Sequence, residues 1–221
     1  LKIDDYKGEN GGIVFPNPNA PTGIYESLEH IEEIIKNNPD VIVIVDEAYI
    51  DFGGETALPL INKYDNLVVV RTFSKSRSMA GLRIGYAISN SELIKALNDV
   101  KYSYNSYTMN RPSLVLGVES IRDEAYFREK VGQIIATRER FVKEIAELGF
   151  TCLPSSANFV FATHESIPAK EIFAAAKENN IYVRYFDKPR IDNYLRISIG
   201  TDAEMDAFVA FLKEYIETKQ N

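Results

Sequence analysis

The chain has 221 residues, of which 45% are hydrophobic and 26% are charged, a composition typical of a folded globular protein rather than a disordered one. Its net charge of -7, without a block of basic residues, argues against a nucleic-acid partner, because phosphate binding needs clustered Lys and Arg. No apolar run reaches the ~20 residues that cross a bilayer, and the first residues lack the form of a signal peptide. We therefore expect a protein of the cytoplasm with no membrane partner.

The first strand candidate, Gly12 to Phe15, runs directly into a proline-rich segment, Pro16 to Gly23. Three prolines and two asparagines in that segment exclude a helix and a central strand. The segment is either a simple turn between strand and helix or a stiff loop whose Asn17 and Asn19 side chains bind a ligand, and the local sequence favours neither. An amphipathic helix capped by Ser27 should follow.

Two runs of aliphatic residues come next, Val41 to Val45 and Leu67 to Val70. Such runs are typical of parallel strands that are buried on both faces. Asp46 and Tyr49 follow the first run, and Lys75 follows the second. Because open α/β sheets bind ligands outside the carboxyl ends of their strands, we expect these side chains to meet at one edge of a sheet.

Lys75, considered alone, is an ordinary solvated lysine, since most lysines are exposed. At a strand end, however, an amine can form an imine with a carbonyl compound if burial or nearby cations lower its pKa. Arg77 and Arg83 are the candidates for such cations, and Ser74 directly precedes the lysine. The residues around Lys75 decide between the two interpretations.

A further strand from Arg83 to Ile88 leads into a helix, for which Ser89 and Glu92 have the form of a capping box. Pro112 suits the first turn of another helix. Three tyrosines near the end of the earlier helix are expected to pack in a core or an interface rather than to line a pocket. These are Tyr102, Tyr104 and Tyr107.

A long amphipathic helix is predicted at about residues 124–148, and Gly149 stops it. Beyond it, short strands alternate with helices, and Thr201 and Glu204 form a second predicted capping box. We therefore divide the chain into domains at residues 1–122 and 123–221, the second a smaller α+β domain. Its predicted strands are residues 150–153, 158–162, 182–186 and 195–199.

Arg184 and Arg196 lie inside predicted strands, where a charge should be paired or face a ligand. Structural ion pairing and anion binding explain each of them equally well. His164 is expected to be solvated, and Cys152 to be a buried and unreactive apolar residue. His30 should be a surface residue, and no metal site is predicted, because no second His or Cys stands at metal-ligand spacing.

The polar residues at the predicted sheet edge suit one cofactor, pyridoxal phosphate. It requires a lysine, an acid for its ring nitrogen, a donor for its phenolic oxygen, and hydroxyls or cations for its phosphate. Lys75, Asp46 and Tyr49 match the first three requirements, and Ser74 with Arg83 matches the last.

Five parts of the chain carry motifs of a known family. They are Asn17–Gly23 (NPNAPTG), Val45–Phe52 (VDEAYIDF), Arg71–Tyr86 (RTFSKSRSMAGLRIGY), Ser155–Phe161 (SSANFVF), and the segments IYVRYF and YLRISIG. The chain resembles the class I and II aminotransferases of pyridoxal-phosphate fold type I, most closely the histidinol-phosphate aminotransferases, from about Gly12 to about Tyr215. The resemblance implies an α/β fold, with a mostly parallel sheet and flanking helices in an incomplete large domain, followed by a small α+β domain.

The resemblance also implies roles at the cofactor. Lys75 would bind the cofactor covalently and act as the catalytic residue, Asp46 would pair with the pyridine nitrogen, and Tyr49 would bond the phenolic oxygen. Ser74 and Arg83 would hold the cofactor phosphate.

On the substrate side, Arg196 resembles the arginine that binds the amino acid's carboxylate, and Arg184 one that helps to hold the phosphate of histidinol phosphate. Asn158 resembles a substrate contact. Most relatives have an asparagine where this chain has Ala20, so its bond to the phenolic oxygen is absent or comes from Asn19.

Members of the family extend further before the proline-rich segment, so the chain is interpreted as the C-terminal part of such an enzyme. The implied reaction moves an amino group between histidinol phosphate and glutamate or 2-oxoglutarate, in a homodimer. The alternatives are another enzyme of the fold, such as an aromatic aminotransferase or a phosphothreonine-type decarboxylase, and a non-catalytic fragment that lacks half of the cofactor pocket.

Overall fold

The computed structural model describes residues 2–220, and contacts divide the chain into two compact units. The first unit comprises Leu1–Asn19 and Tyr25–Arg128, and the second comprises Ala20–Ile24 and Glu129–Asn221. The short segment Ala20–Ile24 thus groups with residues more than a hundred positions later in the sequence. Ser156 N–H donates to the Gly23 carbonyl over 2.9 Å, and a Cβ on Gly23 would lie 2.6 Å from the Ser155 hydroxyl, so only glycine permits this approach.

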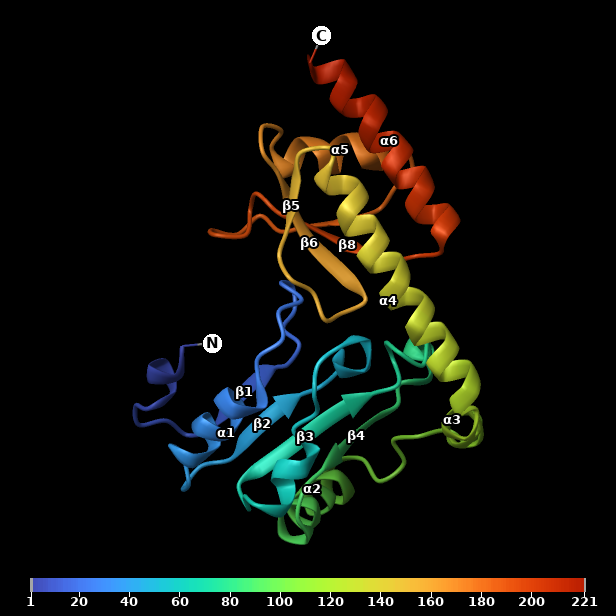
Figure 1. The fold of residues 1–221 in the computed structure, drawn as a ribbon. Helices are drawn as coiled ribbons and strands as arrows, with labels where there is room; N and C mark the ends of the chain where they lie inside the picture. Colours follow the sequence, from blue (N-terminus) through green and yellow to red (C-terminus); the bar gives the residue numbers. More distant parts are fainter. Residues whose placement is uncertain (1, 221) are drawn as a thin grey trace. The chain divides into compact units, whose positions relative to one another are not determined.

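The first unit contains a four-stranded sheet with the order β1–β2–β3–β4 (Figure 1). Its strands are β1 (Ile13–Pro16), β2 (Val43–Asp46), β3 (Leu67–Thr72) and β4 (Gly85–Ile88). The first three strands are parallel, and β4 is antiparallel to β3. The predicted α/β fold with a mostly parallel sheet is therefore confirmed for this unit.

One face of this sheet is buried beneath α1 (Leu28–Lys36), which begins at the predicted cap Ser27. The residues of the strands alternate between faces, so every second residue of β1, β2 and β3 packs against this helix. The central residues of the cluster are Ile13, Phe15, Ile31, Ile34, Ile35, Val43, Val45, Leu67 and Val69. The opposite face is open in places, where Val14 is 69% exposed.

Two helices complete the first unit, α2 (Ser91–Tyr104) and α3 (Arg111–Arg122). The predicted capping box of α2 is wrong. Asn90 is the cap and accepts a hydrogen bond from Leu93 N–H, while the Ser89 hydroxyl donates to the Leu67 carbonyl over 2.6 Å. Serine and asparagine are both favourable caps, but the Ser89 hydroxyl is already bonded to β3 and does not cap the helix. Four short 3₁₀ turns connect these elements, at Ile3–Tyr6, Ile50–Phe52, Leu58–Asn62 and Ala80–Leu82.

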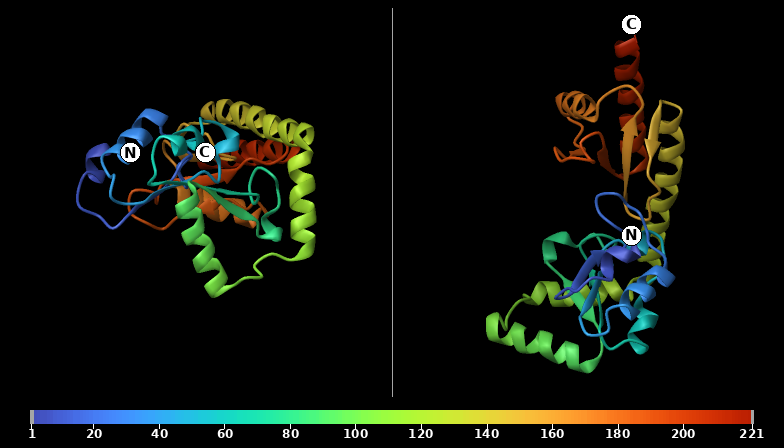
Figure 2. Two further views of the ribbon diagram at one scale, coloured as in Figure 1. Left: turned by 90° about the horizontal axis from the view of Figure 1, so that it is seen from below. Right: turned by 90° about the vertical axis from the view of Figure 1, so that its left-hand side faces the viewer.

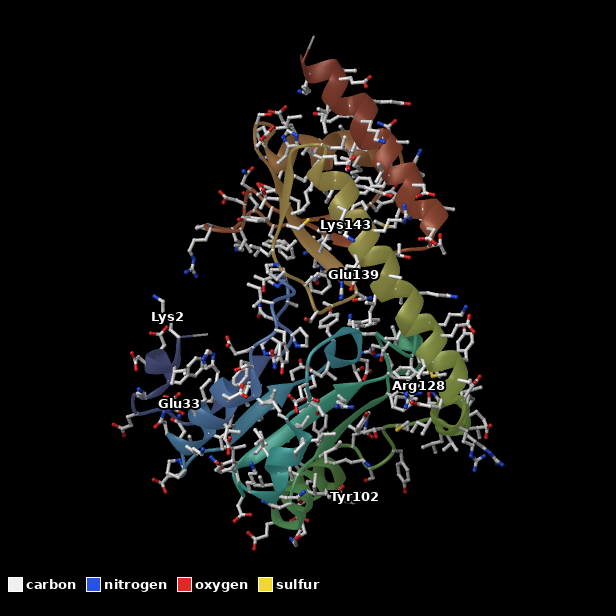
Figure 3. All side chains as sticks on the ribbon, in the orientation of Figure 1. Lys2, Glu33, Tyr102, Arg128, Glu139 and Lys143 are labelled. Atoms are coloured by element: carbon white, nitrogen blue, oxygen red, sulfur yellow. The ribbon has the colours of Figure 1, made fainter. Side chains whose placement is uncertain are left out.

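The three tyrosines near the end of α2 do not enter the core of either unit. Tyr102, which is labelled in Figure 3, is 63% exposed, and Tyr104 and Tyr107 are 91% and 94% exposed. The prediction that they pack in a core is wrong, and an interface role stays a prediction. The tyrosines have no core to pack into, because α2 itself buries none of its residues.

The second unit contains an antiparallel sheet with the order β5–β6–β8–β7, and α4 and α6 lie side by side along it (Figure 2). The unit's elements are α4 (Glu124–Ala146, from Glu129 onward), β5 (Phe150–Cys152), β6 (Phe159–His164), α5 (Ala169–Glu178), β7 (Arg184–Tyr185), β8 (Leu195–Ser198) and α6 (Asp202–Gln220). The predicted capping box before α6 is confirmed, since Thr201 N–H donates to Glu204 and Glu204 N–H donates back to the Thr201 hydroxyl.

One face of this second sheet packs against its helices. Val160 and Ala162 of β6 pair with Ile197 and Leu195 of β8, and all four are buried in the apolar cluster of the unit. Because side chains alternate along a strand, the other face carries the intervening residues, among them Arg196.

Of two predictions about single residues of the second unit, one is wrong and the other is confirmed only in part. His164 is buried rather than solvated: its Nε2 lies 2.9 Å from the Leu148 carbonyl, and its Nδ1 accepts hydrogen bonds from Ser166 N–H and Ile167 N–H. Cys152 is only partly buried, although burial raises the pKa of its thiol to about 11, which agrees with an unreactive residue. His30 is exposed, as predicted, and contacts Glu26.

Candidate functional site

The carboxyl ends of β1, β2 and β3 and the start of β4 meet at one edge of the first sheet. Pro16 pairs with Asp46, and Thr72 pairs with Gly85. The chain leaves the strands in register: Glu47 N–H donates to the Val70 carbonyl over 2.8 Å. Residues that follow each of these strands are therefore delivered to a common edge, as the sequence predicted.

Lys75 and Tyr49 come together at this edge. The Lys75 Nζ lies 5.3 Å from the centroid of the Tyr49 ring, and both residues are partly buried. An ammonium group at this distance from a phenol ring is attracted to the ring face. The Lys75 amine therefore has a specific neighbour in the fold, and its role stays a prediction.

Asp46 is the last residue of β2 and alternates with the buried Val45, so it lies on the sheet face opposite α1. Its Oδ1 accepts a hydrogen bond of 3.0 Å from Ala48 N–H, which fixes the carboxylate at the strand end. The acid, the amine and the phenol are thus contributed by neighbouring strands of one sheet.

Hydroxyls and a cation border the same edge. The Thr72 hydroxyl accepts from Ser74 N–H over 3.0 Å and lies 2.9 Å from the Ser74 hydroxyl. Arg83 is the second residue before β4, adopts a left-handed backbone with φ 56°, and donates to the Ala80 carbonyl over 3.0 Å. Its side chain is otherwise exposed.

The proline-rich loop uses one of its two asparagines for its own structure. Asn17 is buried, its amide donates to the Glu26 carbonyl over 3.0 Å, and its oxygen accepts from Glu26 N–H over 2.7 Å. Asn17 therefore closes the loop and does not face a ligand. Asn19 is partly exposed and stays a candidate.

Arg77 does not supply a cation to Lys75. Its guanidinium lies 4.1 Å from the Phe127 ring centroid, donates to the Ser120 carbonyl and is 3.9 Å from Glu124. Those contacts fasten the loop after β3 to α3 and to the first residues of α4. The expectation that Arg77 lowers the pKa of the lysine is abandoned for this reason.

A buried ion pair beneath the edge was not anticipated from the sequence. The Glu47 side chain is fully buried and receives Arg71 Nη2 at 2.8 Å and Nε at 3.0 Å. It also accepts from the Thr56 hydroxyl at 2.8 Å and from Ala57 N–H at 2.6 Å. Burial works to lower the pKa of Arg71, but the Glu47 carboxylate raises it above its ordinary value. The signal in the sequence was a glutamate and an arginine at the ends of adjacent buried strands.

In the second unit, Arg184 and Arg196 are direct cross-strand neighbours on β7 and β8. Both guanidinium carbons lie over the Phe186 ring, at 5.4 Å and 5.8 Å from its centroid. Within residues 2–220 neither arginine forms an ion pair. Like charges directly opposite each other on a sheet are unfavourable unless an anion balances them. Anion binding by these two arginines stays a prediction.

Asn158 stands immediately before β6, at the end of a tightly held loop. The Ser155 hydroxyl donates to the Phe159 carbonyl, and Arg138 Nη1 donates to the Ala157 carbonyl over 2.7 Å. Arg138 is buried, and burial lowers its pKa. The loop presents Asn158 from a fixed backbone.

Within residues 2–220 no helix combines the length and apolar character needed to cross a membrane. The same residues contain no cluster of three or more His, Cys, Asp or Glu side chains that could hold a metal ion.

Comparison with known proteins identifies relatives along the whole chain. Residues 2–212 match the family described as aminotransferase class I and II. A histidinol-phosphate aminotransferase of Clostridium botulinum (strain 657 / Type Ba4) is 51% identical over 216 residues, which are 98% of this chain and 61% of that protein. The chain thus spans about three fifths of the length of this curated relative.

Solved structures agree with this match. The histidinol-phosphate aminotransferase of Sinorhizobium meliloti, solved in complex with pyridoxal-5'-phosphate, has a TM-score of 0.84 and 27% identity over 94% of this chain and 58% of that one. A decarboxylase of Sulfurospirillum multivorans has a TM-score of 0.85 and 28% identity over 98% of this chain and 66% of that one.

Proposed function

The chain belongs to the class I and II aminotransferases, and we propose that the enzyme containing it transfers an amino group between histidinol phosphate and 2-oxoglutarate, with pyridoxal phosphate as cofactor. The single observation that carries this proposal is the contact of Lys75 with Tyr49 at the sheet edge where β2 ends in Asp46. We assign residues 1–122 to the second half of the cofactor-binding large domain and residues 123–221 to the small domain.

The donors at the edge fit the cofactor. A pyridine ring with an aldehyde, a phenolic oxygen and a phosphate needs an amine, an acid, a hydrogen-bond donor and a phosphate-binding group. Lys75, Asp46 and Tyr49 would supply the first three, and the hydroxyl of Ser74 with the guanidinium of Arg83 would hold the phosphate. Asn19 would add a contact to the phenolic oxygen, in the place where Ala20 cannot.

The chain's own residues then have defined tasks. When bound, the cofactor supplies an electron-accepting ring that stabilises negative charge at the substrate's α-carbon. The Asp46 carboxylate would keep a proton on the ring nitrogen, and the Tyr49 hydroxyl would donate to the ring oxygen. Lys75 Nζ would take the proton from the substrate's α-carbon as a general base.

Arg184 and Arg196 suit a substrate pair that differs in charge. A guanidinium fork binds a carboxylate or a phosphate in bidentate fashion, so one pair of arginines can hold glutamate and histidinol phosphate in turn. Their cross-strand placement without a carboxylate partner in residues 2–220 supports this proposal. Asn158 would contribute a neutral substrate contact.

The assignment of Lys75 is tested in the complete enzyme with bound cofactor. Borohydride reduction followed by digestion and mass spectrometry should place the pyridoxyl group on the peptide that contains Lys75, and Lys75→Ala should abolish both the label and turnover. Lys95→Ala is the matched control, because Lys95 is exposed and pairs with Asp99 on the surface of α2. A label on another lysine, or unchanged turnover of Lys75→Ala, would dismiss the assignment.

Decarboxylation is the second candidate reaction, because the decarboxylase of Sulfurospirillum multivorans shares the fold of this chain at 28% identity. Release of carbon dioxide from phosphothreonine, with no transfer to 2-oxoglutarate, would favour it, and turnover of phenylalanine above histidinol phosphate would favour an aromatic aminotransferase. The isolated chain is expected to bind pyridoxal phosphate weakly or not at all; tight binding would contradict an incomplete pocket.

We further propose that the complete enzyme is a homodimer of the cytoplasm. Apolar side chains exposed on α3 support a protein partner, since patches of this kind mark interfaces. These are Leu114, Val115, Leu116, Val118 and Ile121, each between 47% and 55% exposed. Sedimentation of the complete enzyme tests the dimer, and a monomer at micromolar concentration would contradict it.

A further inference from the structure

Tyr49 lies on a segment that is fastened at both of its ends, by an ion pair and by a hydrogen bond, to the chain that runs from β3 into the Lys75 loop. The segment leaves β2 after Asp46 and continues into the 3₁₀ turn Ile50–Phe52. Glu47 lies two residues before the tyrosine, and Asp51 lies two residues after it. Both acids bind residues of the chain that runs from β3 into the Lys75 loop.

The first fastening is the buried ion pair. Glu47 receives Arg71 of β3 at 2.8 Å and 3.0 Å, and Arg71 also donates to Thr56 over 2.8 Å. Arg71 precedes Lys75 by four residues. The ion pair therefore sets the position of the chain before Tyr49 relative to the strand that leads to the lysine.

The second fastening is a hydrogen bond between Ser76 and Asp51. The Ser76 hydroxyl donates to Asp51 Oδ2, and Ser76 is 6% exposed. Ser76 directly follows Lys75 in the chain. This bond therefore joins the residue after the lysine to the turn after the tyrosine.

We propose that Asp51 and Ser76 are positioning residues which, together with the Glu47–Arg71 ion pair, hold the Tyr49 ring against Lys75. The two fastenings enclose the contact of 5.3 Å between Lys75 Nζ and the Tyr49 ring centroid on both sides. Neither Asp51 nor Ser76 touches the cofactor in this proposal; they act through the tyrosine. The inference rests on the proposed function, because only there does the position of Tyr49 affect chemistry.

The test uses Ser76→Ala and Asp51→Asn in the complete enzyme with cofactor. We expect kcat of the glutamate half-reaction to fall on the order of 10-fold with little change in KM, because a small misplacement of a positioned group lowers the rate more than the binding. The apparent pKa of the Lys75–cofactor absorbance should rise by about one unit, because the Tyr49 hydroxyl would no longer favour the unprotonated form. Ser103→Ala, an exposed serine on α2, is the matched control and should leave both quantities unchanged.

A double-mutant cycle separates positioning from a merely structural role. In the Tyr49→Phe background, Ser76→Ala should have no further effect on kcat or on the absorbance pKa, because the hydroxyl through which the positioned ring acts is gone. Additive effects in that background, or single variants that match Ser103→Ala, would overturn the proposal. Failure of borohydride to label Lys75 in the parent enzyme would instead refute the proposed function.

Discussion

Removal of the buried carboxylate of Glu47 should cost more stability than removal of any exposed acid in the chain. Glu47→Ala would leave Arg71 with Thr56 as its partner and would leave Ala57 N–H without its acceptor. Breaking a buried ion pair costs about 3–5 kcal/mol. We expect about 3 kcal/mol, at the lower end, because the Arg71 side chain keeps one partner and is 19% exposed. That loss is a large part of the ~5–15 kcal/mol that stabilises a typical domain.

Urea unfolding of the cofactor-free enzyme, followed by circular dichroism, measures this loss as a shift of the midpoint. Asp99→Ala is the control, because the Lys95–Asp99 pair has side chains that are 76% and 63% exposed and should contribute less than about 1 kcal/mol. The double variant Glu47→Leu/Arg71→Leu should recover most of the stability, since it leaves no buried charge without a partner. If Glu47→Ala costs no more than Asp99→Ala, or if the double variant is less stable than the single one, the reasoning is refuted.

Two further predictions concern the second unit. Burial raises the Cys152 pKa from 9.0 to about 11, so thiol burial stabilises the fold below pH ~9, and this contribution is lost as pH rises through the folded pKa. At pH 8 the native thiol should react with Ellman's reagent roughly 100-fold more slowly than the thiol of the urea-unfolded chain. Equal rates would contradict the shift. His164→Ala should lower the free energy of unfolding by about 3 kcal/mol, because it creates a cavity and removes three hydrogen bonds. His30→Ala on the surface should lower it by almost nothing, and equal melting temperatures of the two variants would contradict this prediction.

The candidate site was largely readable from the chain because its residues stand at the ends of aliphatic runs. Val43–Asp46 and Leu67–Thr72 are strands whose parallel pairing follows from their composition, and this pairing brings the segments that carry Asp46, Tyr49 and Lys75 to one edge. The family motifs at the same positions led to the same cofactor. What the residues do there stays a proposal.

Partners of polar side chains were predicted less well. Ser89 and Asn90 are equally suitable helix caps by residue type. In the fold, however, the serine hydroxyl bonds to β3, and Asn90 caps α2. Arg77 was expected beside Lys75 and instead lies over Phe127. His164, with a polar ring near a strand end, is enclosed because backbone groups on both sides of it satisfy its two nitrogens.

Sequence alone determined which segments form strands and helices and which reactive residues follow each strand. Hydrophobic periodicity is a local property, so it can be read from neighbouring residues without the rest of the fold. Tertiary structure decided which charges meet. The Glu47–Arg71 pair, the Asp51–Ser76 bond and the juxtaposition of Arg184 with Arg196 each join residues of different elements. A hydrogen bond or an ion pair depends on distances that only the packed fold establishes.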